Sequence, residues 1–292
     1  MATKEQMYQN LLDSMQELSD VQKRLRAILY GMSGAGKTIF AMMIAQAITP
    51  PDQIILYIDF SEGFFVFQNP EWKHLTRRVK RIQYNTSEGL SQLEAISYAV
   101  QAKTGVFANV GCIILDEGTS MADADLRLVR AMNVARNPVL DPDVAEGPDY
   151  IAEQNRFSKT FNVLMGAPVH HIIVCHPRVD KVNNLAITDI GFSPKLGAIL
   201  KRDLHLVGHF TADLPSASGL EDPVYTRWVQ VHPTRTIEAK TRITGLPVKI
   251  EASKLLTAIT EFINGSRGEE EPKETLPIEQ AEDVSDFAIT VE

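Results

Sequence analysis

The sequence predicts an α/β protein in which a mostly parallel sheet is covered by helices on both faces and ends in an antiparallel edge. Apolar strand-like runs alternate with helix-like segments from about residue 25 to residue 205. A glycine-rich turn joins one of these runs to an apolar helix, and closely spaced strands follow one another after residue 205. Strands that alternate with helices form parallel sheets, whereas strands joined by short turns form antiparallel ones.

The elements can be assigned in order along the chain. Residues 1–24 place apolar side chains at helical spacing, including Met7, Leu11 and Met15, and so predict an amphipathic helix. Five apolar runs predict the parallel strands: 24–30, 54–59, 79–84, 111–117 and 169–175. Three segments between them predict helices: 38–48, 90–100 and 149–166. The remaining predictions are antiparallel strands at 204–210, 225–232 and 235–242 and a closing helix at 255–263 that ends at Asn264-Gly265.

Charge is distributed unevenly along the 292 residues. The net charge is −8, and residues 268–292 account for all of it, with nine acidic side chains against one lysine. We therefore predict one domain over 25–265, preceded by the helix of 1–24 and followed by an acidic, disordered tail over 266–292. The end of the tail, 286–292, is a candidate site for a partner protein, the alternative being a tail that only improves solubility.

Composition narrows the class of protein. With 44% hydrophobic and 23% charged residues, the chain is not collagen-like, disulfide-rich or disordered throughout. It has no run of about 18 apolar residues, so no membrane is expected among its partners. Cys112 and Cys175 each lie in an apolar run, which indicates buried thiols in a reducing compartment such as the cytoplasm.

The most specific motif lies between the first strand-like run and the apolar helix. It fits the pattern G-x-x-x-x-G-K-[ST] and consists of Gly31, Met32, Ser33, Gly34, Ala35, Gly36, Lys37 and Thr38. Glycines let backbone N–H groups turn toward a phosphate, and the N-terminus of the following helix adds partial positive charge. We expect Lys37 at the β- and γ-phosphates of ATP and Thr38 at Mg²⁺.

Two strand ends carry carboxylates. Asp116 and Glu117 end the run 111–117; Asp116 is expected to hold Mg²⁺ together with Thr38, and Glu117 to polarise a water molecule. Glu62 follows the run that ends at Asp59. Carboxyl ends of parallel strands open onto the ligand crevice. Either Glu62 or Glu117 can therefore serve as the catalytic base, and the residues alone do not choose between them.

In the order of these motifs the chain resembles the RecA-like phage P-loop ATPases, in particular the small single-domain recombinases and single-strand annealing proteins of the Sak-four type. The resemblance covers roughly residues 25 to 250 and implies a RecA-like core. It implies Glu62 as the base, but one more residue separates Glu62 from Asp59 than in the usual D-x-E, so Glu117 stays the alternative. It also implies that His176, where RecA proteins have glutamine, senses the γ-phosphate.

Two further sets of residues belong to this resemblance. The segment 177–194 has no obvious structure and implies a DNA-binding loop, in which cations and amides grip phosphates and a ring stacks on a base. Its candidate contacts are Arg178, Lys181, Asn183, Asn184 and Phe192. Lys240 and Arg242 are two residues apart on a predicted strand and so share a face. The resemblance implies that they stabilise phosphoryl charge in the site of a neighbouring subunit.

The sequence thus predicts an ATP- and Mg²⁺-dependent hydrolase that assembles into a homo-oligomeric ring or filament. It is expected to act on single-stranded DNA in recombination or annealing, in the cytoplasm of a phage-infected bacterial host. Two alternatives stay open. One is a nucleotide-gated assembly protein without turnover. The other is an AAA+-type helicase loader or DNA-packaging ATPase, because Asp116-Glu117 is more typical of AAA+ loaders.

Overall fold

The computed structural model of the chain describes Gln6 and residues 23–84, 88, 90–182, 184–212 and 226–265. The predicted helix of 1–24 lies almost entirely outside these residues, and the predicted tail lies wholly outside them. The structural account below concerns the described part of the chain.

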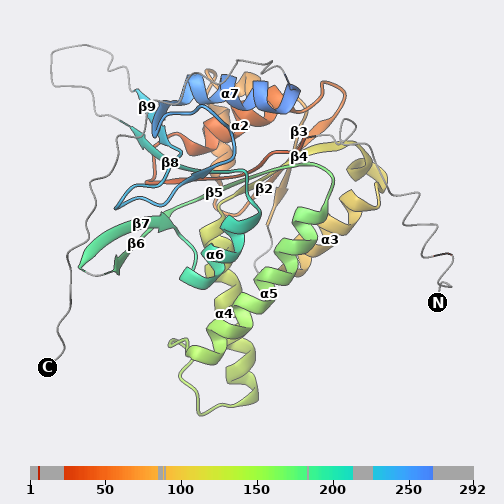
Figure 1. Ribbon diagram of the computed structural model, residues 1–292. Coiled ribbons are helices and arrows are strands. Elements are labelled where there is room, and N and C mark those ends of the chain that lie inside the picture. The colour runs from red at the N-terminus through yellow and green to blue at the C-terminus, as the bar shows by residue number, and fades with distance from the viewer. Residues whose placement is uncertain are drawn as a thin grey trace, which may run out of the picture.

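A nine-stranded sheet forms the centre of the fold, in the order β11-β9-β8-β1-β5-β4-β2-β3, with β10 paired to β8 (Figure 1). The strands from β8 to β3 are parallel to one another, and β9, β10 and β11 add antiparallel pairs. The strands are β1 (Arg26–Gly31), β2 (Ile54–Asp59), β3 (Val79–Gln83), β4 (Val110–Asp116), β5 (His170–Cys175), β8 (Leu206–Ala212), β9 (Arg227–Gln230), β10 (Lys240–Thr241) and β11 (Lys249–Glu251). The predicted α/β class, with a mostly parallel sheet and an antiparallel edge near the C-terminus, is confirmed.

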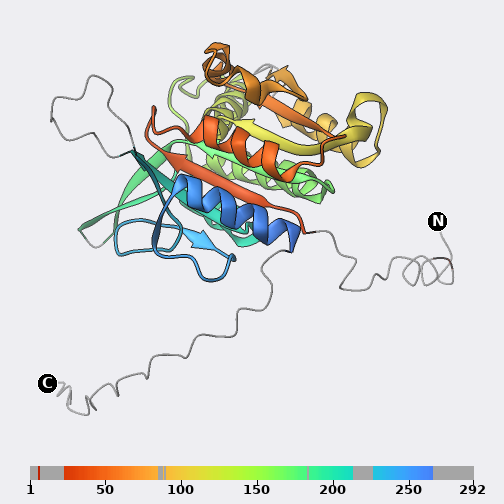
Figure 2. The ribbon, with the colours of Figure 1, turned by 90° about the horizontal axis from the view of Figure 1, so that it is seen from above.

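Helices cover both faces of the sheet (Figures 1 and 2). One face carries α2 (Lys37–Ile48) and α7 (Ala252–Asn264). The other carries α3 (Leu90–Gln101), α4 (Gly118–Arg136), α5 (Gly147–Gly166) and α6 (Pro194–Asp203). Short 3-10 helices lie at η2 (Gly63–Gln68), η3 (Lys73–Thr76) and η4 (Gly105–Asn109). Successive side chains of β1 point to opposite faces of the sheet. Leu29 packs under α2 and α7, whereas Ile28 packs under the helices of the other face.

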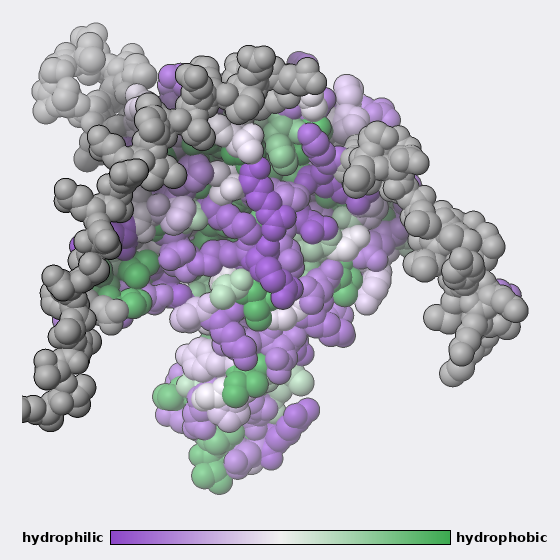
Figure 3. Space-filling model, viewed as in Figure 1, coloured by the Kyte–Doolittle hydropathy of each residue, from purple (hydrophilic) through white to green (hydrophobic). Residues whose placement is uncertain are grey.

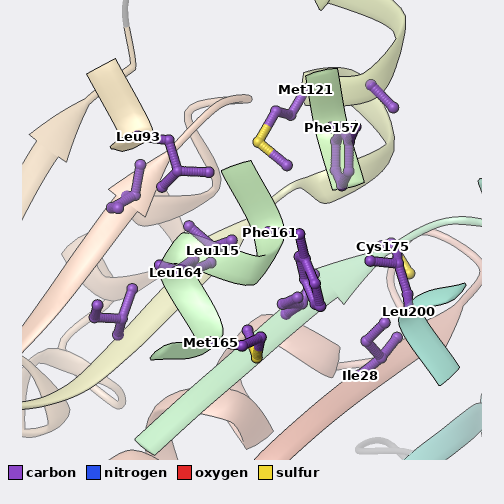
Figure 4. Packing of buried hydrophobic residues seen from close by; sticks show 14 of the residues in the cluster. Ile28, Leu93, Leu115, Met121, Phe157, Phe161, Leu164, Met165, Cys175 and Leu200 are labelled. Carbon is purple, nitrogen blue, oxygen red and sulfur yellow. The ribbon is translucent and has the colours of Figure 1, made fainter. Parts of the chain in front are cut away.

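The core beneath α5 places the end of β4. Phe157, Phe161 and Leu164 of α5 pack over the sheet near Leu115 of β4 (Figure 4). Every residue of β4 is buried, as expected for a central parallel strand that is covered on both faces. This packing holds the last residue of β4, Asp116, at the carboxyl edge of the sheet.

Two helices form where none was predicted. The sequence of α4 has no continuous apolar stripe, because Asp125 and Arg130 occupy inward positions, 1% and 3% exposed. They are stabilised there by ion pairs with Arg156 and Asp149 of α5. The sequence does contain a signal for the start of α6, because Pro194 occupies its first turn, where proline is common in helices.

One loop prediction and two strand predictions differ from the structure. The strand predicted as antiparallel at 204–210 corresponds to β8, which pairs in parallel with β1 and antiparallel only with β9 and β10. Residues 177–194 are not an unstructured loop, because β6 (Pro177–Val182) and β7 (Leu185–Ile190) form an antiparallel hairpin. Within 235–242 only Lys240–Thr241 is a strand. The preceding residues bond to the hairpin instead, since Thr188 of β7 donates to the carbonyl of Thr236 and accepts from the N–H of Glu238, at 2.7 and 2.9 Å.

The free end of the α4–α5 pair is partly apolar. These two helices extend beyond the sheet, and hydrophobic side chains gather at the lower end of Figure 3. The exposed apolar residues of this part are Met132, Val139, Val144, Tyr150 and Ile151. None of the helices in the described part of the chain combines the length and the apolar character that a membrane span requires.

Candidate functional site

A cavity of about 450 Å³ opens at the carboxyl edge of the parallel strands. Its walls come from residues 31–38, hereafter the phosphate loop, from the ends of β4 and β5, and from the start of β9. The segment after β2 also contributes to the walls. The polar, charged and glycine residues of the walls are Ser33, Gly34, Gly36, Lys37, Thr38, Ser61, Gly63, Asp116, Glu117, His176 and Arg227. Since β5 lies between β1 and β4, the residue after β5 comes between the phosphate loop and the residue after β4. Strand ends of an α/β sheet thus assemble one site from segments far apart in sequence.

The phosphate loop leaves β1 and runs into the first turn of α2. Gly36 has a φ of +90°, and a Cβ on Gly31 would lie 2.5 Å from the carbonyl oxygen of Phe210 in β8. Both positions therefore require glycine. The Lys37 ammonium donates to the carbonyls of Gly31 and Met32, at 2.7 and 2.9 Å. Burial lowers the pKa of Lys37, while nearby acidic groups oppose that shift.

Asp116 lies at the floor of the cavity and is 2% exposed. Its Oδ2 accepts hydrogen bonds from the Thr38 hydroxyl at 2.8 Å and from the Tyr57 hydroxyl at 2.5 Å. Burial raises the pKa of Asp116; the hydrogen bonds from Tyr57 and Thr38 oppose this shift, and the carboxylates of Glu117 and Asp59 add to it. The structure thus brings together the two residues that the sequence assigns to a divalent cation.

Thr38 and Asp116 fit a magnesium ion by the chemistry of their donors, a hydroxyl and a carboxylate oxygen. In the described ranges no cluster of three or more histidine, cysteine, aspartate or glutamate side chains is arranged to hold a metal by itself. Magnesium usually keeps several waters and binds through one or two protein oxygens plus substrate phosphates. The two-residue arrangement therefore suits an ion that arrives with a phosphate.

The two candidate bases lie in different surroundings. Glu117 is 5% exposed and lines the cavity. Its Oε1 accepts from the backbone N–H of His176 at 2.9 Å, and its Oε2 accepts from the Ser120 hydroxyl at 3.1 Å. Glu62 is exposed, precedes η2 with a φ of +60°, and does not line the cavity. Glu117 therefore lines the cavity itself, whereas Glu62 does not, although its neighbours Ser61 and Gly63 do.

His176 lines the cavity with a side chain that is 46% exposed. Its Nε2 lies 3.4 Å from Glu117 Oε2, and its chain continues directly into β6. The residue therefore links the cavity to the β6–β7 hairpin.

Within the hairpin segment the candidate DNA contacts differ. Arg178 forms an ion pair with Asp180 at the base of the hairpin, whereas Lys181 and Asn184 are exposed. Asn183 lies outside the described residues. Phe192 is 2% exposed, and its ring packs edge-on to Phe157 with centroids 5.5 Å apart. The prediction that Phe192 stacks on a base is wrong, because the ring is buried in the core cluster beside Phe157 of α5.

Lys240 and Arg242 lie away from the cavity of their own chain. The Lys240 ammonium donates to the carbonyls of Lys201 and Arg202 at 2.7 and 3.1 Å, and the Arg242 guanidinium donates to the carbonyl of Arg202 at 3.1 Å. These carbonyls belong to the last turn of α6, where cations are favourable. Within one subunit the pair therefore stabilises the C-terminal end of α6, and its role toward a neighbouring subunit stays a prediction.

Sequence reasoning missed two residues of the cavity region. Tyr57 reads as a core residue of β2, yet its hydroxyl bonds to Asp116. Arg227 opens β9 and reaches the phosphate loop across the sheet. The alternation along β2 points Tyr57 toward α2, which was a usable signal for the tyrosine. Nothing local marks Arg227, because its contact is set by strand order.

Compared with protein-family models and with curated protein sequences, the chain matches none.

Proposed function

We propose that this protein binds ATP with Mg²⁺ at the phosphate loop and hydrolyses it, and that it acts on single-stranded DNA in recombination or annealing. The observation that carries the nucleotide proposal is the bond of 2.8 Å between Thr38 and Asp116 inside a cavity that also holds Lys37 and Glu117. Hydroxyl, carboxylate and ammonium groups in this arrangement suit a metal-bound triphosphate.

In this proposal each residue of the cavity has a separate role. Loop N–H groups and the N-terminus of α2 bind phosphate oxygens, and Lys37 places a positive charge within the loop. Bound Mg²⁺ supplies further positive charge to the phosphates. Glu117 orients the attacking water and accepts its proton. His176 lies beside Glu117 and directly precedes β6, so a change at the γ-phosphate can be passed through it to the β6–β7 hairpin.

The DNA part of the proposal rests on the resemblance and on the hairpin. Lys181 and Asn184 are exposed near the hairpin turn, where a cation and an amide suit a phosphate backbone. Without Phe192 the proposed contact lacks its aromatic platform, so backbone contacts carry it and binding should weaken steeply with salt.

The test is the ATPase rate of the full chain with and without single-stranded DNA, across a range of salt. We expect measurable turnover that single-stranded DNA stimulates at low salt, and we expect Lys37→Ala to reduce turnover by at least about 100-fold. Nucleotide binding without turnover at high protein concentration would favour the nucleotide-gated assembly protein. Turnover that ignores single-stranded DNA would favour a loader or packaging ATPase.

A further inference from the structure

Arg227 is placed at the phosphate loop by the pairing of three strands. Gly31, which begins the loop, lies beside Phe210 of β8 in a parallel register. Ala212, two residues further along β8, lies opposite Arg227 in the antiparallel β8–β9 pair. The first residue of β9 therefore stands at the same edge of the sheet at which the phosphate loop leaves β1.

The side chain of Arg227 lies directly on the loop. A Cβ on Gly36 would come within 2.7 Å of Arg227 Cδ and closer still to Nε. The same side chain lines the cavity together with Ser33, Lys37 and Thr38. Glycine at position 36 thus leaves room for the arginine as well as for the left-handed backbone.

The Arg227 guanidinium has no acidic partner among the described residues, although Asp116 and Glu117 line the same cavity. Lys37 lines the same cavity, and the N-terminus of α2 adds partial positive charge. Throughout the described ranges, no residue forms a hydrogen bond or an ion pair with this guanidinium, and the cavity carboxylates of Asp116 and Glu117 hold other partners. The two carboxylates balance the two cations of the cavity in formal charge. The guanidinium is nevertheless left without a partner beside Lys37 and a helix N-terminus, a place that favours an anion, and its fork matches phosphate oxygens.

A second cavity lies on the other side of Arg227. It has a volume of about 270 Å³, adjoins the first and shares Gly36, Ile39 and Arg227 with it. Its other walls are largely apolar and include Met43 and Trp72. Arg227 lies where the two cavities meet, whereas Asp116 and Glu117 belong to the first one alone.

We infer that Arg227 binds the α- and β-phosphates of a nucleotide held by the phosphate loop of its own subunit, while the nucleoside enters the second cavity. The inference rests on the proposed nucleotide site. It adds a cation from the same chain to a site in which Lys240 and Arg242 are proposed to act from a neighbour. ADP and ATP both carry the α- and β-phosphates, so Arg227 contributes to the binding of each nucleotide.

The test is calorimetric titration of the full chain with MgADP and, separately, with a non-hydrolysable MgATP analogue. We expect Arg227→Ala to weaken both affinities by a similar factor, roughly 10- to 100-fold. Arg227→Lys should recover part of the loss because it keeps the charge without the fork. Arg235→Ala removes an exposed arginine that lines neither cavity and should change neither affinity. Thermal unfolding of each variant confirms that it is folded.

The outcomes separate the two proposals. If the wild-type protein binds neither nucleotide, the proposed function is overturned and the inference with it. If the wild type binds and Arg227→Ala binds equally well, the inference alone is overturned. A loss confined to the MgATP analogue places the guanidinium at the γ-phosphate and overturns the assignment to the α- and β-phosphates.

The contribution from the same chain has its own test. Subunits with Lys37→Ala and subunits with Arg227→Ala, when mixed, each lack one group of the same site. We expect no recovery of nucleotide binding beyond that of the separate variants. Recovery would require Arg227 to act on a neighbour and would overturn the inference.

Discussion

At the scale of single residues, the two candidate bases differ in how firmly their carboxylates are held. Glu117 is enclosed at the cavity wall and is oriented by the N–H of His176 and the hydroxyl of Ser120. Glu62 is exposed and stands outside the cavity. A general base must lie within hydrogen-bond reach of the proton that it takes, directly or through one water. Position therefore favours Glu117 over the residue that the family resemblance implies.

We predict that Glu117→Gln lowers the turnover number by roughly 100-fold while MgADP affinity stays within about threefold. Glutamine keeps the shape of the side chain and an oxygen that accepts hydrogen bonds, but it takes no proton. Single-turnover hydrolysis measures the first quantity and calorimetry the second.

Glu62→Gln is the matched control, and it should leave turnover nearly unchanged. The opposite pattern, with Glu62→Gln inactive and Glu117→Gln active, would return the base to the position that the resemblance implies. It would also require the segment around Ser61 and Gly63, which lines the cavity, to move when nucleotide binds.

At the scale of elements, the α4–α5 pair encloses several charges between its helices. Asp125 of α4 forms an ion pair with Arg156 of α5 at 3.0 Å. Glu153 of α5 is 4% exposed, and its folded environment favours the protonated carboxyl group. Burial, together with the carboxylates of Asp125 and Asp123, raises the pKa of Glu153 to about 7. The folded state therefore binds this proton more tightly than the unfolded chain does. Stability from this group is complete below the ordinary pKa of 4.5 and is lost as the pH rises to 7.

We predict that Glu153→Gln stabilises the protein at pH 8 by about 2 kcal/mol, because glutamine removes the cost of an ionised buried group. Near pH 4 the glutamate is protonated in both states, and the difference should shrink toward zero. Urea denaturation at both pH values measures it.

Glu71→Gln, which neutralises an exposed carboxylate, serves as the control and should have little effect at either pH. An equal effect of Glu153→Gln at pH 4 and pH 8 would contradict the prediction, because it would indicate a packing change rather than a titration.

The elements also show where sequence reasoning succeeds. The phosphate loop was predictable because its glycines, lysine and threonine are consecutive and lie between a strand and a helix. Asp116 was predictable because a fully apolar run ends in a carboxylate. The hairpin was missed although its turn left a signal, since Asn184 adopts a φ of +63° that asparagine tolerates better than most residues.

At the scale of the whole molecule, the parts that were missed depend on contacts between distant segments. Phe192 is apolar beside polar neighbours, and only the packing of α5 over the sheet decides that its ring is buried. Arg227 meets Gly36 across about 190 residues of sequence because β9 pairs with β8, and β8 with β1. Sequence patterns with a fixed period cannot specify such pairs, whereas they suffice for the sheet and for the phosphate loop.

The role proposed for Lys240 and Arg242 at a neighbouring subunit requires that the protein form a homo-oligomer. Within one subunit both side chains bond to the last carbonyls of α6, so a structural role competes with the proposed role at a neighbour's nucleotide. We predict that Lys37→Ala subunits and Lys240→Ala/Arg242→Ala subunits, each inactive alone, recover ATPase activity when mixed. In a random one-to-one assembly about a quarter of the interfaces combine an intact phosphate loop with an intact pair, which sets the expected recovery.

Two measurements separate the roles of the pair. If Lys240 and Arg242 only stabilise α6, the double variant loses thermal stability and mixing restores nothing, since no neighbour can replace a contact within the chain. If they act across the interface, mixing restores activity even where the stability loss persists. Full activity of the double variant by itself would remove the pair from the site altogether and leave Arg227, from the same chain, as the arginine that serves the phosphates.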